Sequence, residues 1–309
     1  MKELKTLLVR YFRGDETNRL DNFVMGYEGE KDFLQIVKQF IPNQGLFIKD
    51  FIFETPGFVQ VDGVLIMPDQ IHLYEVKNYD ADCSLIDGKI YYNNRHINYN
   101  PLQQIDRACD SFKNILIQEN IRIPVIPHLV LIHPYGTFKS DNSSELSILL
   151  RHELRRHFQG LQDHCNQPNY DPHSIYQVLR KYQIDDWHNH FKINPFNVED
   201  LRRGIYCHQC GSFQMTKLYK SFQCQECSAK ITKHEALKYI IAECCTLYDR
   251  DTISPIEVYN LCDKQLDKYW ISKQMSELLI RVDHGHYAKV SEREYLEDML
   301  RLYHKLKKK

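Results

Sequence analysis

Hydrophobic and polar residues follow two different spacings along residues 26–135. From Gly26 to Phe40 the apolar positions recur at helical intervals, and Pro42 stops the pattern. After this helix, the spacing changes to that of β-strands. The pattern predicts strands over 45–55, 57–68 and 71–78, a hairpin over 83–100 that turns at Asp87-Gly88, an amphipathic helix over 101–118 and a buried strand over 125–134. This order of elements predicts an α/β domain with a mixed sheet.

The rest of the chain is more helical. Residues 1–25 are only weakly patterned, and residues 136–205 predict a helical connector with helices over 144–158 and 171–182. In the C-terminal part we expect three helices. The first covers 233–248, the second begins at the capping box Ser254-Pro255-Ile256-Glu257, and the third covers 268–279. A hairpin over 280–290 follows them. Three helices followed by a hairpin resemble the outline of a winged helix.

Composition and charge narrow the class of protein. The 309 residues are 43% hydrophobic and 26% charged, an ordinary globular balance. Lys plus Arg number 40 and Asp plus Glu number 41, so the formal net charge is -1 and nucleic-acid binding would need local basic patches. No stretch approaches the roughly 20 apolar residues that span a bilayer. Residues 1–20 lack the apolar core of a secretory signal. We therefore expect a cytoplasmic protein with no membrane partner.

Candidate chemistry lies on the second and third predicted strands. A turn at Pro68-Asp69 would place Asp62 directly opposite Glu75. Lys77 would then share their face of the sheet, because side chains alternate along a strand. Two facing carboxylates repel each other unless a cation lies between them, and Mg²⁺ prefers such oxygen ligands. The lysine could orient a water molecule or stabilise charge on a phosphate, so the pattern indicates metal-dependent chemistry.

A simpler interpretation is a partly exposed hairpin with an ordinary cross-strand Glu–Lys pair. The surrounding sequence disfavours it, because VDGVLI and IHLYEV are apolar enough for a sheet covered on both faces. Burying two unpaired acids in such a sheet would be costly. A shift of the turn by one residue would instead put Asp62 and Glu75 on opposite faces, and the metal hypothesis would then fail.

The segments GYEGE, VDGVLI, YEVKN and NPLQQ occur in that order, and together they resemble the nuclease-related domain (NERD) family. That family is a branch of the restriction-endonuclease-like superfamily. The resemblance covers residues 22–135 and implies a restriction-endonuclease-like mixed sheet flanked by helices. It also implies an acid on the first helix, a strand acid, a Glu-x-Lys pair and a glutamine at the start of the next helix. The matching positions are Glu30, Asp62, Glu75, Lys77 and Gln104.

Metal-dependent hydrolysis of phosphodiester bonds is the activity that this resemblance implies. Asp62, Glu75 and the Val76 carbonyl would hold Mg²⁺ or Mn²⁺, and the lysine would assist the water or the developing charge. Glu30 would complete the coordination or support a second ion, and Gln104 would orient the phosphate or the lysine. Both residues have plainer interpretations, namely an exposed glutamine and an ordinary acid near a helix N-terminus.

Four cysteines form two pairs with metal-binding spacing. Two residues separate Cys207 from Cys210, two separate Cys224 from Cys227, and 13 residues lie between the pairs. Such pairs can place four thiolates around one Zn²⁺ with no open position, which predicts a structural site. The pattern resembles a zinc ribbon. Free cysteines in chance pairs, or a redox pair, are alternatives that two matched pairs disfavour.

The remaining cysteines and the histidines of the connector are expected to be structural. The histidines from His152 to His190 share no face with acids and are expected to be solvated or to cap helices. The other cysteines fall mostly on apolar faces and are expected to be small core residues: Cys83, Cys109, Cys165, Cys244, Cys245 and Cys262.

Three lysines are candidate nucleic-acid contacts. Lys217 and Lys220 lie between the two cysteine pairs among aromatic residues, and Lys273 lies in the helix over 268–279. A solvated strand face is the alternative for the two ribbon lysines. The helix carries few cations, which favours a protein partner or packing against the nuclease-like domain over docking into DNA.

Together these observations predict a cytoplasmic, metal-dependent nuclease that acts on DNA, with RNA as an alternative substrate. Its predicted parts are a nuclease-related domain over 22–135, a helical connector over 136–205, a zinc ribbon over 206–230 and a helical, winged-helix-like domain over 231–309. The expected cofactors are Mg²⁺ or Mn²⁺ for catalysis and Zn²⁺ for structure. The rival prediction is a non-catalytic DNA-binding or regulatory protein that uses the ribbon and the winged helix.

Overall fold

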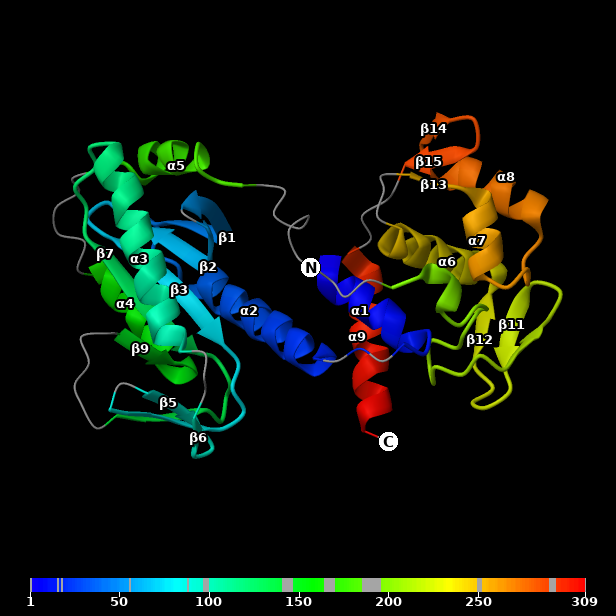
Figure 1. The fold of residues 1–309 in the computed structure, drawn as a ribbon, viewed down its shortest axis with the longest axis horizontal. Coiled ribbons are helices and arrows are strands. Elements are labelled where there is room, and N and C mark those ends of the chain that lie inside the picture. The colour runs from blue at the N-terminus through cyan, green and yellow to red at the C-terminus, as the bar shows by residue number, and fades with distance from the viewer. Residues whose placement is uncertain are drawn as a thin grey trace. The chain divides into compact units, whose positions relative to one another are not determined.

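The chain divides into two compact units, one of residues Met25–Asn189 and one that joins Met1–Val24 to His190–Lys309. The N-terminal residues therefore belong with the C-terminal part of the chain, which the weak patterning of residues 1–25 does not indicate. The computed structural model (Figure 1) describes residues 2–15, 17, 19–55, 57–87, 89–96, 100–140, 147–163, 170–184, 196–248, 252–288 and 293–308.

The unit Met25–Asn189 contains these elements: α2 (Leu20–Phe40, which begins before the unit), β1 (Leu46–Thr55), β2 (Gly57–Ile66), β3 (Ile71–Lys77), β4 (Asp82–Ile86), β5 (Lys89–Tyr92), β6 (Arg95–His96), α3 (Pro101–Gln118), β7 (Val125–Leu131), β8 (Thr137–Ser140), β9 (Ser147–Leu150), η1 (Arg151–Glu153), α4 (Leu154–Asp163) and α5 (Pro172–Arg180). The main sheet has the order β1-β2-β3-β7-β9, and a smaller sheet has the order β6-β5-β4-β8. β1, β2 and β3 are antiparallel, whereas β3, β7 and β9 are parallel. The predicted mixed sheet is therefore confirmed.

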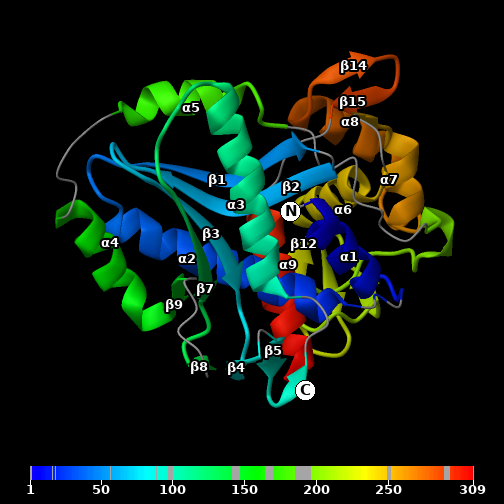
Figure 2. The same ribbon diagram turned by 60° about the vertical axis from the view of Figure 1, so that its left-hand side comes forward.

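Helices cover both faces of the main sheet. Apolar residues of α3 and α5 pack on β1, β2 and β3 from one side, and those of α2 and α4 pack on β2, β3 and β7 from the other. Figure 2 shows α3 crossing in front of the strands and α2 behind them. Because both faces are covered, every residue from Ile71 to Val76 of β3 is buried. This three-layer α/β arrangement is consistent with a nuclease-like fold.

The β2–β3 hairpin has the register that the turn at Pro68-Asp69 predicts. Its paired residues run from Ile66 opposite Ile71 to Gly63 opposite Tyr74. Beyond Gly63, β2 continues to pair with β1, as far as Gly57 opposite Thr55. β3 instead continues beside β7 as far as Lys77. The sheet therefore forks next to Asp62 and Glu75.

The segment over 136–205 is only partly helical, which corrects the prediction of a helical connector. Residues Ser147–Leu150, expected to begin a helix, form β9 and pair in parallel with β7. The three consecutive apolar residues Ile148, Leu149 and Leu150 fit a buried strand as well as a helix, and the free edge of β7 decides between them. The later helix is confirmed as α5, whose N-cap Asp171 accepts hydrogen bonds from the backbone of His173 and Ser174.

The second unit contains these elements: α1 (Lys2–Phe12), η3 (Val198–Asp200), β10 (Met215–Lys217), β11 (Ser221–Cys224), β12 (Lys230–Thr232), α6 (Lys233–Leu247), β13 (Thr252–Ile253), α7 (Pro255–Leu261), α8 (Lys268–Leu278), β14 (Arg281–Asp283), β15 (His286–Ala288) and α9 (Arg293–Lys307). Two three-stranded sheets form, β10-β11-β12 and β13-β15-β14. The three predicted C-terminal helices and their hairpin are present as α6, α7, α8 and β14–β15. The capping box also forms, since the Ser254 N–H and hydroxyl both donate to Glu257.

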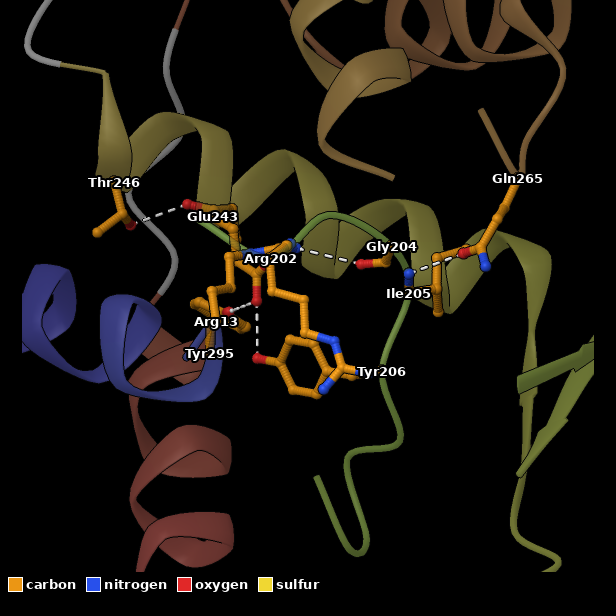
Figure 3. Close-up of polar contacts among 10 residues, drawn as sticks. Arg13, Arg202, Gly204, Ile205, Tyr206, Glu243, Thr246, Gln265 and Tyr295 are labelled. Atoms are coloured by element: carbon orange, nitrogen blue, oxygen red, sulfur yellow. Dashed lines mark hydrogen bonds and ion pairs between the residues drawn. The ribbon is translucent and has the colours of Figure 1, made fainter. Parts of the chain in front are cut away.

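A buried ion pair joins α1 to α6 inside this unit (Figure 3). The Arg13 guanidinium, directly after α1, donates to Glu243 Oε2. The other oxygen of Glu243 accepts from the hydroxyls of Tyr206 and Tyr295, at 2.7 and 2.8 Å. Arg13 also donates to the Arg202 carbonyl, at 2.7 Å. Each buried charge thus has an opposite charge and further hydrogen bonds, which buried ions require.

The cysteines outside the paired motifs mostly lie in the core, as expected. Within the described chain Cys83, Cys109, Cys244 and Cys262 are buried, and Cys245 is partly exposed. Cys165 lies outside the described residues, as does Gly88 of the predicted turn. Among the helices that the structure describes, none combines the length and hydrophobicity needed to cross a membrane.

Candidate active site

The fork of the sheet brings Asp62 next to β3. Its Oδ2 accepts a hydrogen bond from the Val76 N–H, at 2.8 Å. Where the β2–β3 pairing stops, the Asp62 carboxylate thus accepts the hydrogen bond that a backbone carbonyl of a paired strand would otherwise accept. The N–H and C=O of one residue point to the same side of a strand, so the Val76 carbonyl also faces the β2 side of β3.

Glu75 and Lys77 form an ion pair at the same place. Glu75 is 2% exposed, and Lys77 Nζ donates to its Oε1 at 2.5 Å. Burial, and then the charge of Asp62, raise the pKa of Glu75 to about 7. Burial likewise raises the pKa of Asp62, against the opposing effects of Lys77 and the Val76 N–H. Burial disfavours the charged form of Lys77, but Glu75 and Asp62 outweigh it and raise the pKa of this lysine.

Glu30 approaches the cluster from α2. Burial, and then the charges of Asp62 and Asp50, raise the pKa of Glu30 to about 7. Its Oε2 lies 3.7 Å from Lys49 Nζ, and Lys49 is also 3.2 Å from Asp50. Asp62 and Glu75 are thus joined by two further acids and a second lysine.

Sequence reasoning did not find Lys49 and Asp50. Both interrupt the apolar run of β1, and Asp50 has a φ of +50°, a left-handed conformation that Asp tolerates better than most residues. The β1–β2 register runs from Lys49 opposite Gly63 to Phe51 opposite Val61, so it skips Asp50 and Asp62. Two adjacent charges inside an otherwise apolar strand were the available signal.

Gln104 lies in the first turn of α3, which Asn100 caps by accepting from the Leu102 N–H. Its Oε1 is buried and has no hydrogen-bond partner within the described part of the chain. No hydrogen bond between this side chain and Lys77 or the acids is observed among the described residues. Gln104 is therefore not the exposed glutamine of the plainer interpretation, and its acceptor is available to a ligand.

The donor chemistry of the cluster fits a hard divalent cation. Four carboxylates, from Glu30, Asp50, Asp62 and Glu75, converge with only Lys49 and Lys77 as described cationic neighbours. The raised pKa values of Glu30 and Glu75 report the mutual repulsion and burial of these acids. Carboxylate and carbonyl oxygens are the ligands that Mg²⁺ prefers, so this group of residues could hold such an ion.

The paired cysteines meet in one cluster at the start of the sheet β10-β11-β12. The four Sγ atoms lie within 4.8 Å of one another. Cys207 and Cys227 are 3.5 Å apart, as are Cys210 and Cys224. Zn–S bonds of about 2.3 Å require sulfur atoms roughly 3.8 Å apart in a tetrahedron. These cysteines could therefore bind zinc.

Both cysteine pairs have the same backbone turn. The Gly211 N–H donates to the Cys207 carbonyl at 2.7 Å, and the Ser228 N–H donates to the Cys224 carbonyl at 3.0 Å. Gly211 and Ser228 both have positive φ angles. Two identical turns present the thiols of each pair toward a common centre, which unrelated cysteines have no reason to do.

The three candidate nucleic-acid lysines are all exposed. Lys217 lies at the end of β10, Lys220 lies in the turn before β11, and Lys273 lies on α8. The aromatic Tyr219, between Lys217 and Lys220, is 88% exposed. Their exposure is compatible with nucleic-acid contacts, which stay a prediction.

Three histidines that the sequence pattern does not connect, His72, His128 and His157, form a cluster on the face of the main sheet that α2 and α4 cover. His72 Nδ1 and His128 Nε2 are 2.8 Å apart, and His128 Nδ1 is 2.8 Å from Ser147 Oγ. His157 Nε2 is 2.9 Å from the Tyr74 hydroxyl. His157 is thus packed among aromatic rings, which corrects the expectation that it is solvated or caps a helix. His164, His188 and His190 lie outside the described residues.

Residues 25–132 match the family model of the nuclease-related domain. The match lies wholly within the unit Met25–Asn189 and contains the acids of the fork, Lys77 and Gln104. This segment is therefore a nuclease-related domain. The match covers less than half of the chain, and the cysteine cluster and the C-terminal helices lie outside it. No curated protein and no solved structure matches the chain.

Proposed function

We propose that the nuclease-related domain hydrolyses phosphodiester bonds in DNA and depends on Mg²⁺ or Mn²⁺. The observation that carries this proposal is the fork between β2 and β3. There Asp62, Glu75 and Lys77 lie together in a crowded group of charged side chains, in which Glu75 is buried. Such crowding is costly for stability and is typical of a site that is kept for function.

Within this proposal Asp62, Glu75 and the Val76 carbonyl hold the ion, and Glu30 completes the set of ligands or supports a second ion. A bound divalent ion lowers the pKa of water and shields phosphate charge. Lys77 remains protonated at neutral pH, because Glu75 and Asp62 raise its pKa. Its Nζ can then donate a hydrogen bond to the attacking water or to a phosphate oxygen. Gln104 orients the phosphate or an adjacent part of the substrate.

The second unit then serves to present the nucleic acid or to recruit a protein partner. We propose that Cys207, Cys210, Cys224 and Cys227 hold one structural Zn²⁺ in a zinc ribbon, and that residues 231–309 are winged-helix-like. Lys217, Lys220 and Lys273 are the proposed contacts to nucleic acid. The proposed location is the cytoplasm.

A cleavage assay tests the catalytic proposal. We expect the full chain to cut DNA with Mg²⁺ or Mn²⁺ and not with EDTA. Glu75→Ala and Lys77→Ala should each lower the rate by about 10²-fold or more. The first removes a proposed metal ligand, and the second removes the proposed donor to the attacking water or the phosphate. Glu54→Ala and Lys38→Ala are matched controls, since both side chains are exposed in the same unit, and should cut as the wild type does.

Single-stranded DNA, double-stranded DNA and RNA are assayed in parallel, since the same chemistry serves both nucleic acids. Preferential cutting of RNA would overturn the assignment of DNA as substrate. DNA binding without cutting, retained in Glu75→Ala and Lys77→Ala, would overturn the nuclease proposal in favour of a binding protein.

A further inference from the structure

A cavity of about 460 Å³ lies between the open edge of β2 and the first turns of α3. Phe58 and Gln60 line it from the strand, and Gln103, Gln104 and Arg107 line it from the helix. The cavity exists because β2 no longer pairs with β3 beyond Gly63, so no neighbouring strand fills this side. Its volume lies in the range of about 300–1,000 Å³ that is typical of small-molecule sites.

The polar groups of the cavity fit a ligand that both donates and accepts hydrogen bonds. Four of its side chains are uncharged primary amides, namely Gln60, Asn100, Gln103 and Gln104. The Oε1 of Gln104 is buried without a partner in the described structure, and an unpaired buried acceptor is costly. A phosphate only accepts hydrogen bonds, so it cannot satisfy both ends of an amide. A nucleobase edge can do so, and glutamine is a common partner of adenine.

The apolar and cationic residues of the cavity fit the other parts of a nucleotide. Phe58 is 42% exposed at the cavity, and aromatic side chains stack on bases of any identity. Arg107 is exposed and has no ion-pair partner among the described residues, so its charge is available to a phosphate.

We propose that this cavity binds one unpaired nucleobase of the substrate strand, next to the phosphate that the fork would hold. Gln60 precedes Asp62 by two residues of extended strand, or about 7 Å. A base seated in the cavity therefore lies close to Asp62 on the same strand. A base stacked inside a duplex cannot enter such a cavity, so the favoured substrate is single-stranded or has a base turned out of the helix. The nature of the ligand rests on the proposed nuclease function.

Equilibrium binding of short DNA strands to the full chain tests this inference without requiring cleavage. The probes are an end-labelled single strand and a strand of equal length in which every residue is abasic, measured by fluorescence anisotropy in EDTA. Both carry the same phosphates, but only the first carries bases. We expect the base-bearing strand to bind about tenfold more tightly or better. Phe58→Ala and Gln104→Leu should each remove most of this difference, and Phe58→Ala should leave the affinity for the abasic strand unchanged.

Matched variants separate the cavity from general effects. Tyr135→Ala removes an aromatic side chain that is 81% exposed elsewhere in the unit, and Gln118→Leu changes an exposed glutamine at the other end of α3. Neither should alter the preference for bases, and Phe58→Tyr should keep it. Equal affinity for both strands, or equal losses for both in Phe58→Ala and Gln104→Leu, would overturn the inference.

The outcomes also distinguish the two proposals. Metal-dependent cutting without any base preference would leave the nuclease function standing and remove the nucleobase cavity. A base preference that Phe58→Ala abolishes, without cutting under any condition, would leave the cavity standing and remove the nuclease function.

Discussion

Buried polar residues of the nuclease-related unit are stabilised in two ways. At the fork, Glu75 has a cationic neighbour in Lys77, and Asp62 accepts a backbone N–H, yet the acids still repel one another. On the other face of the sheet, His72 and His128 are hydrogen-bonded to each other and carry no charge. The acids are therefore crowded by like charges, whereas the imidazoles avoid such repulsion by staying neutral.

The histidine cluster makes a testable contribution to the pH dependence of stability. Burial lowers the pKa of His72 to about 3 and that of His157 to about 4, and it also lowers the pKa of His128. In the unfolded chain these groups titrate near pH 6.5. Below that pH the unfolded state binds more protons than the folded state, so the free energy of unfolding falls as the pH falls toward 4. The slope is up to about 1.4 kcal/mol per pH unit for each histidine that stays neutral.

Urea unfolding between pH 7 and 4.5 measures this slope. We expect His128→Asn to make it shallower, whereas His173→Asn, at an exposed position of α5, should leave it unchanged. Parallel pH profiles for the wild type and His128→Asn would mean that the cluster accepts protons in the folded state.

Among the elements, α1 illustrates a helix that depends on partners distant in the sequence. It is short, and isolated helices of about this length are marginal in water. Its inner face buries Leu4, Leu8 and Val9, and contacts with α6 and α9 hold it in place. Arg13, at its end, makes the buried ion pair with Glu243. Tertiary contacts, more than local propensity, therefore determine this helix.

Glu243→Gln tests the importance of that ion pair. The substitution keeps the shape of the side chain but leaves the buried guanidinium of Arg13 without an opposite charge, since Glu243 is 0% and Arg13 1% exposed. Removing one partner of a buried pair costs about 3–5 kcal/mol. We expect a loss of this order in the free energy of unfolding of the second unit, measured by chemical denaturation.

The double variant Arg13→Met with Glu243→Leu should be less destabilised than Glu243→Gln, because it buries no unpaired charge. Glu226→Gln, at an exposed position of the same unit, is the control and should change stability little. A loss below about 1 kcal/mol in Glu243→Gln would show that water or another group replaces the lost charge.

At the scale of the molecule, the two units have separate cores and separate candidate metal groups. The acids of the fork lie in the unit Met25–Asn189, and the four cysteines lie in the other. If the cysteines hold zinc, metal binding contributes directly to the folding of the second unit. Loss of the metal should then affect one unit and not the other.

Cys207→Ser tests this separation. We expect the wild type, purified under reducing conditions, to carry one zinc per chain by metal analysis, and the variant to carry much less. The unfolding transition of the second unit should move to a lower denaturant concentration, while that of the nuclease-related unit stays. Cys245→Ser, which changes a cysteine of α6 outside the cluster, should retain the zinc.

Two results would contradict this prediction. Less than about half an equivalent of zinc in the reduced wild type would remove the zinc ribbon, because a closed four-thiolate site binds zinc tightly. Loss of all cooperative folding in Cys207→Ser would show that the two units do not fold independently.

The elements nearest the fork could be predicted from sequence because local patterns specify them. The turn at Pro68-Asp69 set the β2–β3 register, and Asn100-Pro101 marked the start of α3. Ser147–Leu150 could not be assigned correctly, because its three consecutive apolar residues become a strand only beside the open edge of β7. Lys49 and Asp50 were missed for a similar reason, since only the fold brings β1 and α2 to the same acids.

The sequence alone determined the residues that meet through short-range rules, namely the acids and lysine of one hairpin and the cysteines of two tight turns. Strand alternation and turn geometry act over a few residues, so spacing suffices to predict them. Only the tertiary structure decided that α1 belongs with the C-terminal unit, that three distant histidines pack together, and that Gln104 lines a cavity at the open edge of β2. These features depend on which surfaces meet after the chain has folded, and hydrophobic burial is non-directional. No local pattern therefore specifies them.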